Sequence, residues 1–338
     1  MRKLASIQKI MNLQPIAQAD AIEKATVLGW QLVVKKEEFK VGDLVVYCEI
    51  DSLMPDRTEF EFLKPRGMRV RTIRLRGQIS QGICFPLSIL PTDFDMKEDA
   101  DCTEALGIVK YEPPMPACLS GKAKGRFPSF IPKTDETRVQ VLQKLLDKYK
   151  DAECYITEKL DGSSATFFVK DGVFGVCSRN LELIEDTENS FWKVARQLDI
   201  ESKLQSMNGN YAIQGELIGE GIQNNKLKLK RQTVMFFNAF DIDKFEYLPF
   251  DKFSDLMKEL DLPVVPVISH SYMLSNDIDK IIGMSTIKSR ICADAWAEGI
   301  VIRPLSEKID LLLSNENFNN GRVSFKAINP EFLLKYGE

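Results

Sequence analysis

A lysine in a short loop is the residue of this chain best placed to do covalent chemistry. Lys159 stands in the run Glu158-Lys159-Leu160-Asp161-Gly162, between two strand-like stretches at residues 155–157 and 165–169. An amine placed in this way can attack a nucleoside triphosphate and carry the nucleotide covalently. Because a free lysine is almost fully protonated at neutral pH, the attack needs help from a metal-bound phosphate, a nearby positive charge or desolvation.

The same run also fits a simpler interpretation. Lysine, aspartate and glycine are common in loops, so these residues alone are equally typical of a solvated hairpin bend. The single histidine, His270, lies between two serines, and no nucleophile elbow is found near it, which argues against a Ser-His-Asp hydrolase. Any catalysis therefore depends on lysine and carboxylate side chains, and the rest of the chain has to decide.

The composition sets the class of protein. The chain has 338 residues, enough for two domains, and its seven cysteines include no Cys-x-x-Cys pair. These cysteines predict neither a zinc site nor a disulfide framework, and we expect an intracellular location, cytoplasmic or nuclear. No apolar run approaches the ~20 residues of a membrane span, and the N-terminus lacks a signal-peptide core. We therefore expect no membrane partner, and the sequence implies no protein partner.

One segment is strongly basic, although the net charge of −4 gives no global sign of nucleic-acid binding. Residues 64–76 contain no acid and hold the basic residues Lys64, Arg66, Arg69, Arg71, Arg74 and Arg76. Since phosphate contacts are local, the segment predicts a nucleic-acid surface, and a charged edge strand is the alternative. Its alternation of basic and apolar residues changes parity near Thr72, where a β-bulge would keep the arginines on one face.

The chain divides into two expected domains. Residues 1–106 contain strand-like runs at 31–34, 44–50, 68–75 and 82–85, which fit a small OB-type β-barrel that binds RNA. Residues 107–133 are rich in proline and glycine and are expected to be an ordered linker. Residues 134–338 mix strands and helices without regular βαβ spacing, which predicts an α+β domain with largely antiparallel sheets. Residues 134–136 are expected to open its first helix.

Charged residues of this second domain stand at the ends of apolar strand-like runs, where a site would collect them. Glu216 follows the run 211–215, Glu298 precedes the run 300–303, and Lys326 lies within 323–328. Arg179 comes twenty residues after Lys159, and Phe237 lies in the aromatic run 236–241.

This ordered series resembles the covalent nucleotidyltransferase superfamily of ATP-dependent DNA ligases, RNA ligases and mRNA capping enzymes. The motifs usually called I, III, IIIa, IV and V look like residues 158–162, 215–216, 237–241, 298–303 and 324–326. The chain looks like an RNA ligase of the Naegleria/Deinococcus type, in which an OB domain precedes the transferase domain. The run 128–138, which includes Lys133 and Arg138, also resembles that family.

The resemblance implies an ATP-grasp-like ligase adenylation fold, and two features favour RNA ligase over its relatives. DNA ligases and capping enzymes carry an OB domain after the last motif, whereas here twelve residues follow Lys326 (338 − 326). DNA ligases also place an arginine at the position of Ser164. The alternatives are DNA nick sealing, GTP-dependent capping, and a nucleic-acid-binding protein without catalysis.

The resemblance also implies roles for single residues. Lys159 would form a lysyl-AMP with ATP, Lys326 would neutralise the α-phosphate, and the adenylate would move to an RNA 5′-phosphate for attack by a 3′-hydroxyl, at nicks in duplexes. The carboxylates around a Mg²⁺ or Mn²⁺ ion would be Asp161, Glu216 and Glu298. Adenylate contacts are expected from Glu158, Arg179 and Phe237, with Phe236 as the alternative stacking ring. RNA contacts are expected from Arg69, Arg71, Arg74, Arg76, Lys133 and Arg138.

One position departs from the family pattern. Related RNA ligases often show two motif V lysines spaced Lys-x-Lys, but the first position here is Ser324. Either Lys326 suffices, or Arg322 or the series Lys226, Lys228 and Lys230 contributes the missing charge.

Overall fold

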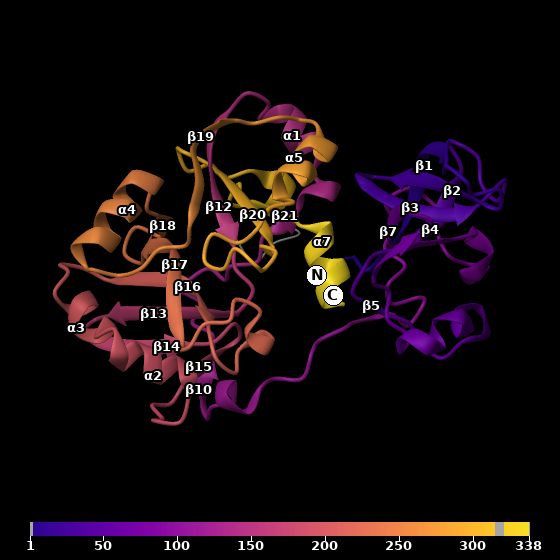
Figure 1. The fold of residues 1–338 in the computed structure, drawn as a ribbon. Coiled ribbons are helices and arrows are strands. Elements are labelled where there is room, and N and C mark those ends of the chain that lie inside the picture. The colour runs from indigo at the N-terminus through magenta and orange to yellow at the C-terminus, as the bar shows by residue number, and fades with distance from the viewer. Residues whose placement is uncertain (1–2, 315–320, 338) are drawn as a thin grey trace.

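The computed structural model describes residues 3–314 and 321–337, and Figure 1 shows a smaller N-terminal unit beside a larger body. In the N-terminal unit (residues 3–110), five antiparallel strands form a sheet in the order β3-β2-β1-β4-β8. They are β1 (Ala5–Pro15), β2 (Ile22–Val27), β3 (Trp30–Lys35), β4 (Leu44–Cys48) and β8 (Ile83–Phe85). The hairpin β6 (Thr72–Leu75) and β7 (Gln78–Gln81) and the short helices η1 (Thr58–Arg66) and η2 (Leu87–Ile89) complete it.

The basic segment corrects one sequence-based prediction. The expected strand over 68–75 begins only at Thr72, and the β6–β7 ladder runs from Thr72 opposite Gln81 to Leu75 opposite Gln78 with no register shift. The preceding residues pair elsewhere, since the Val70 amide donates to the Ser52 carbonyl. The predicted β-bulge is therefore wrong, because the parity changes where the chain changes its partner strand.

The larger body contains two sheets. The first has seven antiparallel strands in the order β10-β15-β14-β13-β16-β17-β18. They are β10 (Ala123–Arg126), β13 (Ser163–Lys170), β14 (Val173–Cys177), β15 (Leu181–Leu183), β16 (Tyr211–Ile218), β17 (Thr233–Asp241) and β18 (Glu246–Tyr247). Helices α2 (Ser190–Gln197), α3 (Ile200–Gln205) and α4 (Phe250–Glu259) share its main apolar core. The sequence-based prediction of an α+β domain with mostly antiparallel sheets is confirmed.

The second sheet has five strands in the order β11-β21-β20-β12-β19. They are β11 (Thr137–Arg138), β12 (Glu153–Lys159), β19 (Val267–Met273), β20 (Gly299–Pro304) and β21 (Phe325–Ile328). Helices α1 (Gln143–Lys148) and α5 (Ile278–Ser285) share a core with one face of this sheet, through residues such as Ile156, Ile302 and Phe325. Because side chains alternate along a strand, their neighbours Lys159, Arg303 and Lys326 point to the opposite face.

The start of the second domain differs from expectation. No helix begins at residues 134–136; instead β11 pairs in parallel with β21, and a 3-10 turn, η4 (Val139–Val141), leads into α1 at Gln143. The expected linker also carries strands. Short β9 (Val109–Lys110) pairs with β5 (Ser52–Leu53), and β10 pairs with β15 of the larger body. The remaining short elements are η3 (Ala117–Leu119), η5 (Gln223–Asn225) and α6 (Leu311–Ser314). In the described residues, no helix is long and apolar enough to cross a membrane.

The last helix joins the two parts of the molecule. Helix α7 (Pro330–Tyr336) lies between the N-terminal unit and the larger body in Figure 1. Phe332 and Leu333 belong to the same buried cluster as Ile7 and Trp30 of the N-terminal unit. Glu331 of α7 also pairs with Arg74 of β6. The second sheet is thus tied to the N-terminal unit through shared apolar packing.

This packing predicts the effect of a substitution in α7. Replacing Phe332, which is 1% exposed, with Ala should lower the free energy of unfolding by about 3 to 5 kcal/mol, since it leaves a cavity in the shared core. Chemical denaturation followed by circular dichroism measures the change. Lys335→Ala, on the solvent side of the same helix, should change it by less than about 0.5 kcal/mol. Equal effects of the two substitutions would contradict the packing.

Candidate active site

The pairing of β12 with β20 brings the lysine loop to a carboxylate. Lys159, the last residue of β12, stands opposite Gly299, the first residue of β20. Glu298 precedes that glycine, and its Oε2 lies 2.6 Å from Lys159 Nζ. Both side chains are largely enclosed, at 21% and 15% exposure. A pair of residues 139 positions apart in the chain therefore meets because of strand register.

Gly162 lets the same loop approach the other sheet. A Cβ atom at this position would lie 2.4 Å from the Leu217 carbonyl oxygen and 2.9 Å from Glu216 Cγ. Such contacts are too close for any other residue without a shift of β16. The glycine of the Lys-x-Asp-Gly run thus has a structural reason, because it allows β16 to bring Glu216 next to the lysine.

The electrostatics of this site are dominated by crowded carboxylates. Burial works to lower the pKa of Lys159, but the charges of Glu298 and Glu216 outweigh it and hold that pKa above its usual value. Burial raises the pKa of Glu216 to about 8, with Glu298 and Asp161 adding to the rise against the opposing effect of Lys159. Without a ligand, the amine is therefore protonated and not yet a nucleophile.

The donor set fits a hard divalent cation. Carboxylate oxygens are the ligands of Mg²⁺ and Mn²⁺, and the carboxylates of Glu298 and Asp161 lie near enough to Glu216 to add to the burial that raises its pKa. The residues that the structure describes contain no ready-made group of three His, Cys, Asp or Glu ligands. Asp161 pairs with Lys226 at 2.8 Å, while Glu298 pairs with Lys159. Such an arrangement suits an ion that keeps most of its waters and takes few protein ligands.

The two residues predicted to contact adenine, Glu158 and Phe237, have different surroundings. Glu158 is 2% exposed, and burial raises its pKa. Its Oε2 accepts from the Arg290 amide at 2.8 Å, and Ser289 lies within hydrogen-bonding reach of the same carboxylate. In β17, Phe236 lies in the main apolar core, but Phe237 lies outside it and has the Arg303 guanidinium over its ring. The structure thus places Phe237, and not Phe236, on the side that faces the second sheet.

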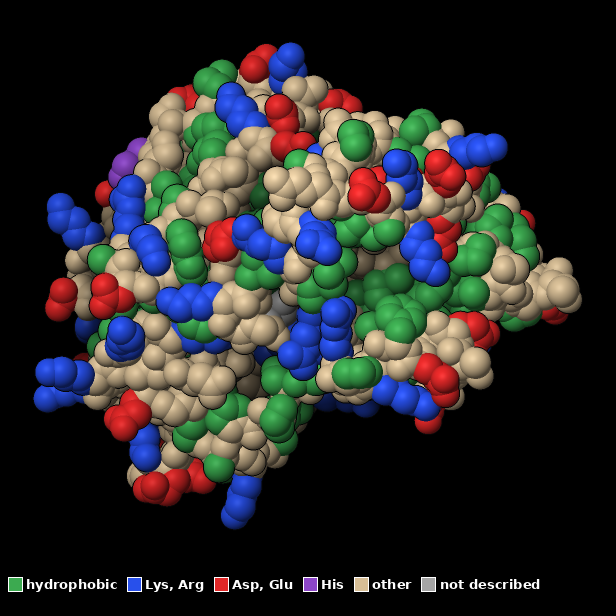
Figure 2. All heavy atoms as spheres, turned by 45° about the vertical axis from the view of Figure 1, so that its right-hand side comes forward, with side chains coloured by type: hydrophobic (Ala, Val, Ile, Leu, Met, Phe, Trp, Pro, Cys, Tyr) green, Lys and Arg blue, Asp and Glu red, His purple; other side chains and the backbone are tan. Residues whose placement is uncertain are grey.

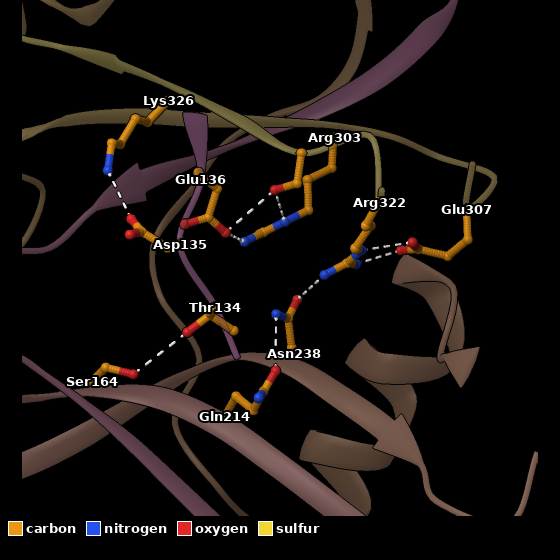
Figure 3. A network of polar contacts seen from close by, with 11 residues as sticks. Thr134, Asp135, Glu136, Ser164, Gln214, Asn238, Arg303, Glu307, Arg322 and Lys326 are labelled. Carbon is orange, nitrogen blue, oxygen red and sulfur yellow. Dashed lines mark hydrogen bonds and ion pairs between the residues drawn. The ribbon is translucent and has the colours of Figure 1, made fainter. Parts of the chain in front are cut away.

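Asp135 connects two of the predicted cations. Figure 3 shows Lys326 of β21 pointing toward it, at 3.3 Å. Arg179, from the loop between β14 and β15, lies 2.8 Å from its other oxygen. Burial works to raise the pKa of Asp135, but Lys326 and Arg179 lower it to about 2. Burial beside Lys159 lowers the pKa of Lys326.

Ser324 has its own role in the second sheet. Its side chain is fully buried and accepts from Arg303 Nε at 2.9 Å. Arg303 also pairs with Glu136 at 2.8 Å (Figure 3). Related ligases often carry a lysine at the position of Ser324. Here this position therefore carries a small hydroxyl that accepts from the buried Arg303. Arg303 supplies positive charge directly beside it.

Two of the other candidates for the missing charge, Arg322 and Lys226, are paired with carboxylates, whereas Lys228 and Lys230 are exposed. Arg322 is buried, pairs with Glu307, and donates to Asn238 Oδ1 at 2.8 Å (Figure 3). Lys226 pairs with Asp161. Lys228 is exposed and lies 3.7 Å from Asp294.

The predicted RNA-binding residues separate into buried and exposed groups. Arg69 and Arg138 are corrections, because both guanidinium groups are largely buried and bind Asp51, at 2.7 and 3.2 Å. Arg138 joins β11 to the N-terminal unit, whereas Arg69 and Asp51 both belong to that unit. Arg74 and Arg76 are exposed and Arg71 is partly buried. Lys133 donates to Asn180 Oδ1 near the Arg179 loop, at 3.0 Å.

The sequence-based reasoning missed several members of the site. Asp135 and Glu136 are predicted to open a helix and lie in the run 128–138 that resembles the family, but no role is assigned to either, and they bind Lys326 and Arg303. The sequence feature that could have indicated their place in the site is the pair of adjacent acidic residues directly before a strand. Lys226 was considered for phosphates but contacts Asp161. No periodicity could have shown this contact, since a loop positions the lysine.

The chain matches two family models, an OB-fold domain over residues 4–87 and an RNA ligase over residues 152–328, which is more than half of the chain. The chain belongs to the RNA ligase family. The expected RNA ligase resemblance and N-terminal OB fold are therefore confirmed. Among curated proteins, no significant match to the chain was found.

Solved structures of the Naegleria gruberi RNA ligase resemble this RNA ligase over its whole length. A point mutant without ligand is 39% identical with a TM-score of 0.88, covering 98% of this chain and 97% of that chain. Two other mutants, each with ATP and Mn, are 39% identical. Their TM-scores are 0.90, covering 100% of both chains, and 0.89, covering 98% of both chains. The two domains of this RNA ligase thus have the same arrangement as those structures.

The close approach at Gly162 yields a prediction for this RNA ligase. Gly162→Ala should displace β16 and Glu216, and lower the rate of protein–nucleotide adduct formation at least about 100-fold, because small misplacements at a reacting centre are costly. Gel assays with labelled nucleotide measure the rate. Gly125→Ala, where a Cβ would meet nothing within 4 Å, is the control and should retain the parent rate. An unimpaired Gly162→Ala enzyme would contradict this assignment.

Proposed function

We propose that this RNA ligase uses ATP and a divalent metal ion to join RNA 3′-OH and 5′-phosphate ends at nicks in duplexes. The observation that carries the proposal is the enclosed Lys159 amine, 2.6 Å from Glu298 and within the field of Glu216. The Naegleria relatives solved with ATP and Mn support the choice of nucleotide and of metal. Magnesium is the other hard cation that suits these oxygen donors.

In the first step, Lys159 Nζ attacks the α-phosphorus of ATP. The new N–P bond gives lysyl-AMP, and the bond to the pyrophosphate oxygen breaks. The attacking amine must first lose its proton, and Glu298, in contact with it, is placed to hold that proton at Oε2. Lys326, whose pKa is lowered by burial, would offset charge on the α-phosphate.

A metal ion would be held by Glu216, Glu298 and Asp161. When bound, such an ion supplies positive charge that favours the neutral amine and stabilises charge on the transferred phosphate. The Lys159–Glu298 pair has to loosen as this happens. The protein keeps the carboxylates close together and largely shielded from water, since low-polarity surroundings strengthen these electrostatic interactions.

The adenosine would lie between the two sheets. Phe237 offers a ring for stacking on the adenine. The buried carboxylate of Glu158 can accept from an exocyclic amino group. Arg179, joined to the site through Asp135, would contact the adenylate or the RNA end. These contacts would favour adenine over guanine, which carries a carbonyl at the corresponding ring position.

The RNA would then be adenylylated on its 5′-phosphate and sealed by the 3′-hydroxyl, with release of AMP. Figure 2 shows Lys and Arg side chains gathered beside a hollow near the middle of one face. In this proposal, the barrel of residues 1–106 grips the duplex with the exposed Arg74 and Arg76 and the partly buried Arg71, and residues 107–133 link it to the transferase domain 134–338. Lys133 would add a phosphate contact.

We also infer a cytoplasmic or nuclear location, since all seven cysteines are unpaired.

The covalent step is tested by removing its nucleophile. Incubation with labelled ATP and Mg²⁺ or Mn²⁺ should give a protein–AMP adduct that Lys159→Ala abolishes, because no other side chain then carries the nucleotide. Lys258→Ala, on the solvent face of α4, should form the adduct at the parent rate. An undiminished adduct in Lys159→Ala would exclude this mechanism.

The substrate is tested with matched nicks. We expect fastest sealing of a nicked duplex whose 3′-OH strand is RNA, slower sealing when that strand is DNA, and little joining of single strands. Rates of ligated product from the three substrates at equal enzyme and ATP concentrations measure the preference. Equal rates with DNA on the 3′-OH side would favour DNA nick sealing, and adduct formation with GTP but not ATP would favour capping.

A further inference from the structure

A buried ion pair connects the Lys-x-Asp-Gly loop to a second loop. Lys226 Nζ lies 2.8 Å from Asp161 Oδ2, and the two side chains are 8% and 13% exposed. Charged pairs of this kind are costly to bury, and removing one partner leaves the other charge uncompensated. The pair therefore places a buried cation against the Asp161 carboxylate at the edge of the site.

Aromatic side chains of α7 enclose the same amine. Lys226 Nζ lies 4.8 Å from the centre of the Phe332 ring and 5.3 Å from that of Tyr336. A cation over an aromatic ring gains electrostatic attraction, more so where water is excluded. Because Phe332 also packs in the core of the N-terminal unit, the position of Lys226 depends on how α7 sits against that unit.

The loop that carries Lys226 is constrained in an unusual backbone conformation. Left-handed φ values occur at Gln223 (42°), Asn224 (58°), Asn225 (46°) and Lys228 (55°). Such values cost energy in residues other than glycine and persist where the surroundings hold them. The Asn225 side chain closes the loop, since it donates to the Leu229 carbonyl at 2.8 Å and accepts from the Leu229 amide at 3.0 Å.

From these contacts we infer that Lys226 is a positioning residue for the ligase reaction. It holds Asp161 in place. Through Lys226, the position of α7 on the N-terminal unit affects the position of the Lys-x-Asp-Gly loop. In this role Lys226 acts through Asp161. This inference rests on the covalent mechanism proposed above. It assigns the 223–230 loop to the first chemical step, where the alternatives were a phosphate contact or a solvated strand face.

The loop offers a matched pair of lysines for the test. Lys226→Met keeps the length of the side chain and its packing on the α7 rings but removes the charge. Lys228→Met makes the same change two residues away, at a side chain that is 70% exposed. Lys226→Arg restores the charge. The single-turnover rate of protein–AMP formation is measured over a range of ATP concentrations, which separates the maximal rate from the half-saturating concentration.

We expect Lys226→Met to lower the maximal rate about 10-fold to 100-fold, with a smaller change in half-saturating ATP, because a misplaced group at the site affects the chemical step. Lys226→Arg should recover much of the loss, and Lys228→Met should match the parent. In an Asp161→Asn background, Lys226→Met should cause little further loss, since the carboxylate it positions is gone.

Three results would overturn the inference: a parent maximal rate in Lys226→Met, a loss confined to half-saturating ATP, or the same fold loss with and without Asp161. The second result would indicate direct contact with ATP. Lys226→Gln serves as a second variant if the Met variant does not fold, as judged by circular dichroism. These outcomes are distinct from failure of the covalent mechanism, which would show itself as an adduct that survives Lys159→Ala.

Discussion

The register between β12 and β20 is the constraint on which the rest of this site depends. It sets Lys159 opposite Gly299 and so places the amine against Glu298. A shift of one residue would turn the lysine to the α1–α5 face, where apolar side chains pack. Burial of Ile156 and Ile302 in that core therefore fixes the orientation of the reactive side chain, and apolar packing determines where the chemistry occurs.

The site is built as a balance of charges that a ligand must change. The charges of Glu298 and Glu216 hold the pKa of Lys159 above its usual value and keep the amine protonated, while burial raises the pKa of Glu216. A divalent cation and a nucleotide would reverse this balance. In the second sheet the charges are instead paired with each other, since Arg303 and Glu136 form a buried ion pair beside Ser324. Ser324 fits there because a lysine would place a further charge next to that arginine.

The same logic extends to the join between domains. Asp51 of the N-terminal unit binds the Arg138 side chain. Arg138 belongs to β11, and in the backbone pairing of β11 with β21 it stands opposite Lys326. Helix α7 adds a second connection through Phe332. Both connections begin at residues that belong to the second sheet or follow it directly. The relative placement of the two domains is thus coupled to the strands that carry the reactive groups.

The sequence by itself determined the ordered motifs, the mostly antiparallel α+β body and the residues from Lys159 to Lys326 that gather at the site, because strand-end charges and apolar alternation are local patterns. It did not determine the partners of Arg69 and Arg138, the strand at 137–138, or the contact of Lys226 with Asp161. Those depend on which distant segments pack together. The sequence pattern around a basic residue is the same whether its side chain faces solvent or a buried carboxylate. Only the tertiary structure could therefore distinguish an exposed basic side chain from a buried, paired one.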